Sequence, residues 1–86
     1  MKFHATILIE LKEGILDPQG RAVEGVLKGL NYPVEHVRVG RVLEMELEAK
    51  SEAEAKETAL SIAKALANPV MEVYTLEALK ALQEVG

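Results

Sequence analysis

Alternating apolar and polar residues run from His36 to Glu48, and this segment constrains the fold more than any other. A period of two is typical of a β-strand with one buried face. Strands usually have about 5–6 residues, and at about 3.3 Å per residue this one would span roughly 40 Å. A chain of 86 residues cannot pair all of such a strand internally. We therefore expect one half to pair within the chain and the other half to pair with a second copy.

Two other segments are predicted to be strands. The odd positions from Phe3 to Leu11 are all apolar, whereas most of the even positions are polar, which indicates a strand with one buried face. Residues 70–74 form a shorter strand candidate, Val-Met-Glu-Val-Tyr. In the long segment, Gly40 and Arg41 interrupt the apolar row, as a bulge or a bend would.

Two helices are predicted from their caps and their apolar spacing. Asp17 is a suitable N-cap before Pro18, and helical spacing continues to Leu30. Ser51 and Glu54 fit a capping box, in which each side chain accepts a bond from an unpaired backbone N–H. This second helix should end at Asn68-Pro69, because a residue before proline avoids the helical conformation. Leucines at 76, 79 and 82 predict a short final helix over residues 76–85.

These elements predict a single α+β domain over residues 1–86. Strand, helix, long strand, helix and strand follow one another, with a short C-terminal helix after them. We expect a three-stranded antiparallel sheet with the two main helices on one face. So small a sheet has exposed edges, which natural proteins usually cover or pair. The edges and the long strand together favour a homo-oligomer whose sheet continues across the interface.

Composition excludes several classes of function. The chain has no cysteine, which removes disulfides, thiolate metal sites and cysteine nucleophiles. Its net charge is −4, and it has neither a basic cluster nor an aromatic platform, so nucleic acid is not an expected partner. No apolar run approaches the roughly 20 residues of a membrane span, and the N-terminus does not resemble a signal peptide. We expect a cytoplasmic protein without a membrane partner.

No catalytic or metal centre is predicted. His4 and His36 fall on the polar faces of strands, where solvent exposure is the ordinary interpretation. Three glutamates at positions 44, 46 and 48 share one strand face, which indicates a solvated face rather than a metal-binding row. The glycines form neither a GxGxxG nor a Walker A loop. No nucleophile can be placed beside a base and an orienting group.

Two features leave a choice between a binding role and a structural one. The segment from Asp17 to Gly20 could bind an anion at the start of a helix, although plain helix capping explains it fully. Arg38 and Arg41 flank Gly40 in the long strand. They form either a point for docking a partner or two surface charges, and arginine is enriched at protein interfaces.

Three blocks in the sequence resemble the PurS family. They are Leu16-Asp17-Pro18-Gln19-Gly20, Val37-Arg38-Val39-Gly40-Arg41 and Ala67-Asn68-Pro69-Val70-Met71-Glu72. Each block alone is weak, but three in order, in a chain of this length, are specific. The resemblance extends from the first strand to about Glu77.

The resemblance implies a non-catalytic subunit of formylglycinamidine ribonucleotide (FGAM) synthase in purine biosynthesis. Such subunits form dimers that bridge a glutaminase, PurQ, and an ATP-dependent synthetase, PurL, and are thought to help ammonia pass between them. The whole complex is a carbon–nitrogen ligase with glutamine as the amido donor. ATP and magnesium would be used by the synthetase, with no cofactor in this subunit. The residues expected to bind partners are Asp17, Gln19, Arg38, Gly40, Arg41, Asn68 and Pro69.

The sequence leaves two other classes of function open. A small ferredoxin-like regulatory module would bind amino acids or nucleotides at a dimer edge, but the sequence lacks a full βαββαβ set. A small enzyme would have to work from Asp17, His36 or the glutamate row. Binding of a small ligand by the isolated chain would favour the first class, and activity of the isolated chain would favour the second.

Overall fold

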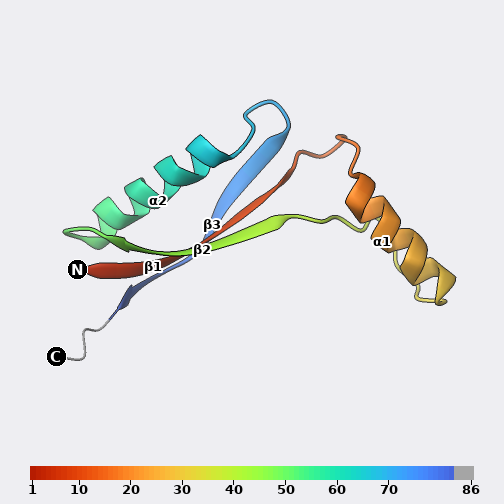
Figure 1. Ribbon diagram of the computed structural model, residues 1–86, viewed down its shortest axis with the longest axis horizontal. Helices are drawn as coiled ribbons and strands as arrows, with labels where there is room; N and C mark the ends of the chain where they lie inside the picture. Colours follow the sequence, from red (N-terminus) through yellow and green to blue (C-terminus); the bar gives the residue numbers. More distant parts are fainter. Residues whose placement is uncertain (83–86) are drawn as a thin grey trace.

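The computed structural model describes residues 1–82 as three strands and two helices (Figure 1). In chain order these elements are β1 (Lys2–Leu11), α1 (Pro18–Gly29), β2 (Arg41–Glu48), α2 (Glu52–Leu66) and β3 (Glu72–Leu82). No helix within this part of the chain is long and apolar enough to cross a membrane.

The three strands form one antiparallel sheet in the order β2-β1-β3. Phe3 lies opposite Leu47 on β2 and Ala81 on β3, and Ile9 lies opposite Arg41 and Tyr74. This arrangement confirms the predicted three-stranded antiparallel sheet and the α+β class. It also leaves both β2 and β3 as edge strands.

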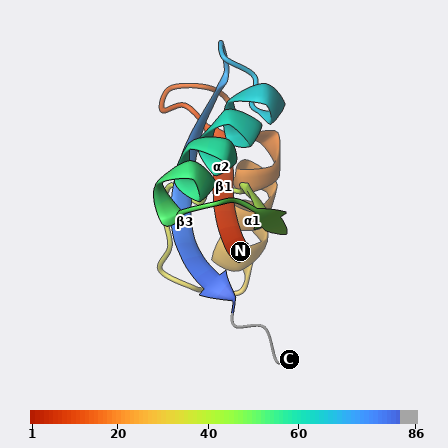
Figure 2. The same cartoon turned by 90° about the vertical axis from the view of Figure 1, so that its left-hand side faces the viewer.

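The core lies between the sheet and α2. Ala55, Ala59 and Ala63 recur every four residues on one side of the helix and are fully buried. They pack over the odd residues of β1, of which Phe3, Ile7 and Ile9 are the largest buried side chains. Figure 2, seen from one end of the molecule, shows α2 lying over the sheet. Because alanine is small, the helix can approach the sheet closely.

The predicted C-terminal helix is wrong, because β3 continues to Leu82. Leu76 and Leu79 stand three positions apart, which suggested a helix. In a regular strand that spacing would place them on opposite faces. A bulge shifts the register between Thr6 and Ile7, so that Ile7 pairs with Leu76 and Thr6 with Ala78. The extra residue turns both leucines toward α2, where they join the core. Residues 83–86 lie outside the described part.

The first of the two predicted helices, α1, is also placed differently, because only α2 lies on the sheet. α1 makes no extensive contact with any strand and extends from one end of the sheet as a separate arm (Figure 1). The molecule measures 52 × 31 × 13 Å, with a radius of gyration of 16.7 Å. A compact domain of 86 residues would have a radius of about 12 Å. Helical periodicity identified the helix but not the surface against which it packs.

The predicted long strand is only partly paired. β2 begins at Arg41, and residues 37–40 continue beyond the ladder without a neighbouring strand. The part of the predicted strand that pairs within the chain is therefore the eight residues of β2. Pairing of the remainder with a second copy stays a prediction.

Candidate partner-docking site

The three sequence blocks meet at the end of β1. A shallow pocket of about 310 Å³ lies there, and its lining includes Asp17, Gln19, Gly40, Arg41 and Glu72. Four of the predicted partner-binding residues thus share one pocket, although they come from α1, the segment before β2, and β2 itself. Asn68 joins them through Glu72, whose Oε1 accepts its N–H. Arg38 lines a neighbouring open groove instead, and Pro69 lines a third hollow.

Asp17 connects α1 to the segment that precedes β2. One carboxylate oxygen, Oδ1, accepts the N–H of Gly20 at 2.9 Å and caps the helix, as predicted. The other, Oδ2, accepts the N–H of Val39 at 2.9 Å. These bonds from Val39 and Gly20 stabilise the ionised form and hold the pKa of the Asp17 carboxyl below its ordinary value.

Glu24 makes a second connection of the same kind. Its Oε1 accepts the N–H of Val37 at 3.1 Å, and its Oε2 lies 3.3 Å from Nζ of Lys28. The bond from Val37, followed by that from Lys28, holds the pKa of Glu24 below its ordinary value. The N–H groups of Val37 and Val39 point the same way, as in any extended segment, and two carboxylates of α1 take the place of a neighbouring strand.

Close approach of the backbone requires glycine at Gly20 and leaves little room for a side chain at Gly40. A Cβ at Gly20 would overlap the carbonyl oxygen of Val37 and the carboxylate of Asp17. A Cβ at Gly40 would lie 3.0 Å from the carbonyl oxygen of Ile9. The start of α1, the segment before β2 and the end of β1 are therefore in direct backbone contact. We call this region, together with the loop between α2 and β3, the junction.

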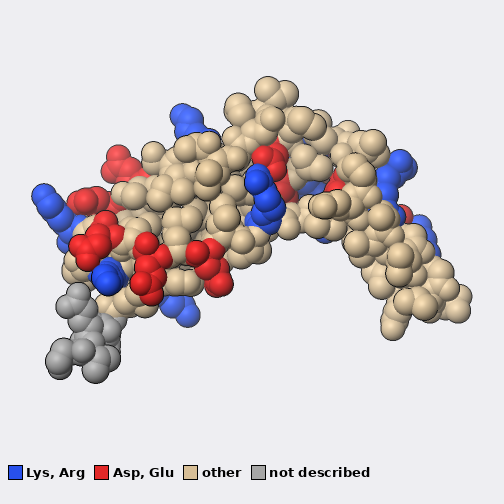
Figure 3. Space-filling model, viewed as in Figure 1, with Lys and Arg blue, Asp and Glu red and all other residues tan. Residues whose placement is uncertain are grey.

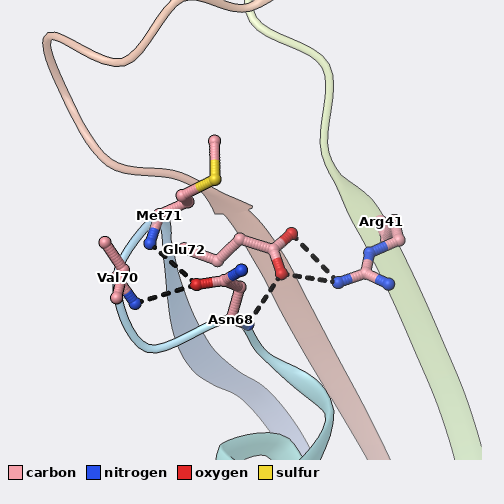
Figure 4. Close-up of polar contacts among 5 residues, drawn as sticks. All are labelled: Arg41, Asn68, Val70, Met71 and Glu72. Atoms are coloured by element: carbon pink, nitrogen blue, oxygen red, sulfur yellow. Dashed lines mark hydrogen bonds and ion pairs between the residues drawn. The ribbon is translucent and has the colours of Figure 1, made fainter.

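Arg41 and Glu72 join the two edge strands across β1 (Figure 4). Nη2 of Arg41 lies 3.0 Å from both carboxylate oxygens of Glu72. Oε1 of Glu72 also accepts the N–H of Asn68 at 2.9 Å. The carboxylate is thus shared between a guanidinium on β2 and the backbone of the loop that leads into β3.

Asn68 organises that loop. Its Oδ1 accepts the N–H groups of Val70 at 2.9 Å and Met71 at 3.1 Å, and its backbone carbonyl accepts the N–H of Glu72 at 2.8 Å. Lys12 holds the loop from the other side, because its N–H donates to the carbonyl of Met71 and its Nζ donates to that of Pro69. An asparagine that bonds the backbone two and three residues ahead is typical of a tight turn.

Arg38 is bound within the chain as well. Its Nη2 donates to the carbonyl of Leu11, and its Nη1 lies 3.8 Å from Oε2 of Glu10. Both predicted docking arginines therefore hold parts of their own chain together. Their direct contact with a partner stays a prediction.

A family model that matches nearly the whole chain identifies the family of these blocks. The family model described as "PurS: Phosphoribosylformylglycinamidine (FGAM) synthase" matches residues 4–80. The chain belongs to the PurS family.

Relatives and solved structures of PurS agree with this assignment. The structure of Thermus thermophilus PurS is 64% identical and has a TM-score of 0.92, over 96% of this chain and 100% of that one. The PurS subunit of Archaeoglobus fulgidus FGAM synthase is 40% identical over 74 residues, which are 84% of this chain and 92% of that protein. A PurLQS structure from Thermotoga maritima contains a chain that is 29% identical, with a TM-score of 0.82, over 90% of this chain and 96% of that one.

Three residues of the junction in this PurS chain were not predicted from the sequence. Glu72 ends one of the three blocks but is not among the predicted site residues, and neither are Lys12 and Glu24. Glu72 carried one usable signal, because a carboxylate that closely follows an Asn-Pro turn can bond back to the turn. Nothing local points to Lys12 or Glu24, since their partners lie 57 and 13 positions away.

The junction is suited to holding surfaces rather than to proton transfer. Its two shifted carboxyls, Asp17 and Glu24, have lowered pKa values and are therefore ionised acceptors near neutral pH. His4 lies 4.0 Å from Glu44 on the open face of the sheet, and His36 is exposed. In residues 1–82 no group of three or more side chains is arranged to hold a metal ion.

Proposed function

We propose that this chain is a non-catalytic subunit of a cytoplasmic FGAM synthase. It would bridge the glutaminase PurQ and the ATP-dependent synthetase PurL and help ammonia pass between them. The complex would then act as a carbon–nitrogen ligase with glutamine as the amido donor. The match of the PurS family model to residues 4–80 is the observation that carries this proposal. The PurLQS structure that contains a similar chain supports PurL and PurQ as the partners.

The construction of the junction supports a bridging role. Its carboxylates and guanidinium groups bond to backbone or to each other and fix the relative positions of α1, β2 and the loop before β3. A bridge needs surfaces held at constant separation, because binding partners in fixed positions loses less conformational entropy. We assign the predicted site residues to this task, which includes direct partner contact by Gln19 and Pro69. ATP and magnesium would be used by the synthetase, with no cofactor in this subunit.

We propose further that residues 1–86 form a single domain that works as a homodimer or a homotetramer. Apolar side chains of the α1 arm are open to solvent, with Val26 64% exposed and Val23 and Leu30 exposed as well. Full burial of a fully exposed side chain of this kind contributes about 1.5–3 kcal/mol, and each of these partly covered ones would contribute a share of that. A second copy that covers this stripe and pairs with residues 37–40 would account for both the arm and the long strand.

The assembly itself can be tested by mixing the chain with PurL and PurQ from the same organism. Size-exclusion chromatography with light scattering should show a complex that contains all three chains. A complex of PurL and PurQ that forms equally well without this chain would contradict the bridging role.

The regulatory-module alternative is not favoured by the family match. Isothermal titration of the isolated chain with amino acids and purine nucleotides separates the two functions. The bridging proposal predicts no saturable heat.

A further inference from the structure

We propose that the loop after α2 carries a preformed apolar docking surface for a non-identical subunit whose contact region is apolar and rimmed by carboxylates. We call it the loop-tip surface, and its apolar members are Leu66, Val70, Met71, Val73 and Tyr74. The inference rests on the proposed function, because it says which surface of the chain meets a partner in the complex.

The loop-tip surface is unusually apolar for an exposed part of a small protein. Val70 is 75% exposed, and the other four members are exposed as well. Beside them lies a hollow of about 370 Å³ whose lining includes Pro69, Val73 and Tyr74. Val70 and Met71 are neighbours in the loop, and Val73 and Tyr74 line the same hollow. Exposed apolar side chains that group in this way, unlike single ones, mark interaction sites. A hollow next to an apolar projection is the shape that accepts an apolar side chain in return.

The backbone under these side chains is fixed before any partner arrives. The N–H groups of Val70 and Met71 bond to Asn68, and Asn68 itself is held by Glu72 (Figure 4). Arg41 in turn holds Glu72 from the far edge strand. A loop that is already ordered loses little entropy on binding, so more of the contact energy remains as affinity. This gives the junction a purpose beyond stability, since it presents Val70 and Met71 in one position.

The charges around the loop-tip surface indicate the chemistry of its occupant. Lys12 and Lys64 line the hollow together with Glu72, and the charge of Glu72 is already balanced by Arg41. The rim is therefore positive, although the chain as a whole carries −4. Interfaces place opposite potentials against each other. The fitting occupant presents apolar side chains with carboxylates around them.

A second copy of this chain does not fit that description. A symmetric contact of the surface with itself would bring the Lys12 and Lys64 charges of both copies into one interface, and like charges repel. On the face seen in Figure 3, a cluster of acidic side chains lies over β2 and the start of α2, at the opposite end of the sheet. Contact with that end would be head-to-tail and would produce open-ended chains unless the rotation happened to close a ring.

The test measures binding of the intact chain to PurL and to PurQ separately by biolayer interferometry. Val70→Asp should weaken binding to at least one of them by about tenfold or more. The substitution places a carboxylate at the centre of the apolar contact, where it would also face the carboxylates that surround the partner's contact region. Ala53→Asp is the matched control, since it adds the same charge at an exposed position at the far end of α2. It should leave both affinities unchanged.

Two single variants that each reverse the charge of a lysine, one at the hollow and one away from it, test the positive rim. Lys64→Glu and Lys56→Glu alter the net charge equally on the same helix, but only Lys64 lines the hollow. Lys64→Glu should weaken binding by about three- to tenfold at low salt, with a smaller effect at high salt. Equal effects of the two variants would overturn the assignment of the rim.

The outcomes separate this inference from the proposed function. If the wild-type chain binds neither PurL nor PurQ, the proposed function itself fails. If the wild-type chain binds and Val70→Asp binds equally well to both, only the loop-tip surface is overturned. If Val70→Asp instead changes the oligomeric state in light scattering, the occupant is a second copy and the inference is wrong.

Discussion

Arg41 and Glu72 lie 31 positions apart in the sequence, yet Nη2 of Arg41 lies 3.0 Å from both carboxylate oxygens of Glu72. The pair connects the two edge strands of the sheet over the central strand. Glu72 is only 18% exposed and also holds the backbone of Asn68, whereas Arg41 is 56% exposed. The pair therefore fixes the loop between α2 and β3 to β2.

Replacing Glu72 with Gln should loosen this loop more than it destabilises the fold. A partly exposed ion pair contributes about 0.5–1 kcal/mol, so the melting temperature should fall by only a few degrees. Hydrogen exchange at the amides of Val70 and Met71 should accelerate, because Asn68 loses its anchor. Arg41→Lys should act in the same direction, since lysine has no planar fork of donors.

Arg21→Lys is the matched control for Arg41→Lys, because Arg21 is an exposed arginine on α1. It should not alter exchange at Val70 and Met71. Equal exchange rates in the Glu72→Gln variant and the wild type would show that the ion pair does not order the loop.

Gly20→Ala should destabilise the protein by about 1–3 kcal/mol, because the added Cβ overlaps the carbonyl of Val37. Gly25→Ala in the same helix meets nothing within 4 Å and should stabilise by about 0.5–1 kcal/mol, the usual difference between the two residues in a helix. Urea unfolding of both variants measures the contrast. A stability of Gly20→Ala equal to that of the wild type would contradict the close packing at the junction.

Acid should detach the α1 arm from the segment before β2. The folded chain lowers the pKa values of Asp17 and Glu24, so both carboxylates add stability that is fully present above their ordinary pKa of about 4. That stability is lost as the pH falls through the lowered values. Asp17→Asn should therefore be less stable than the wild type at pH 7, and the difference should shrink toward pH 2.

Thermal unfolding of the wild type and the Asp17→Asn variant between pH 7 and pH 2 measures this dependence. Glu46→Gln, on the exposed face of β2, is a control that removes one carboxylate from outside the junction. A difference between Asp17→Asn and wild type that stays constant across this range would refute the role given to the ionised carboxylate.

Val26→Asp should shift the oligomer toward the monomer. Val26 is exposed on the α1 arm, and a charge there would have to be buried if a second copy covers the stripe. Light scattering at several protein concentrations should show a dissociation constant raised by tenfold or more. Ala53→Asp, with the same added charge on α2, should keep the wild-type state, and an unchanged oligomer in Val26→Asp would exclude α1 from the self-interface.

Local features of the sequence predicted most of the elements. The alternation in β1 and the caps at Asp17 and Ser51 depend on neighbours within a few residues, and the structure confirms both caps. The strand conformation around Leu76 and Leu79, with both side chains on one face, could not be predicted in the same way. Their helical spacing arises from a bulge, and a bulge is defined by pairing with β1, which lies about 70 positions away.

The placement of α1 and the long-range bonds of the site were beyond sequence reasoning for a related reason. An apolar stripe such as Val23, Val26 and Leu30 shows that a surface needs covering but not which surface covers it. The pairing of Arg41 with Glu72, and of Glu24 with Val37, follows only from the folded topology. The resemblance to PurS identified blocks that do converge, while the bonds that join them needed the structure.

The central claim, that the chain couples two active sites without one of its own, is tested most directly by the rate of FGAM formation. PurL and PurQ from the same organism would be assayed with and without this chain, first with glutamine and then with ammonium as the nitrogen source. We predict that the chain is needed with glutamine and dispensable with ammonium, because free ammonium reaches the synthetase without a bridge. Rates that are unchanged by the chain with both nitrogen sources would contradict the account.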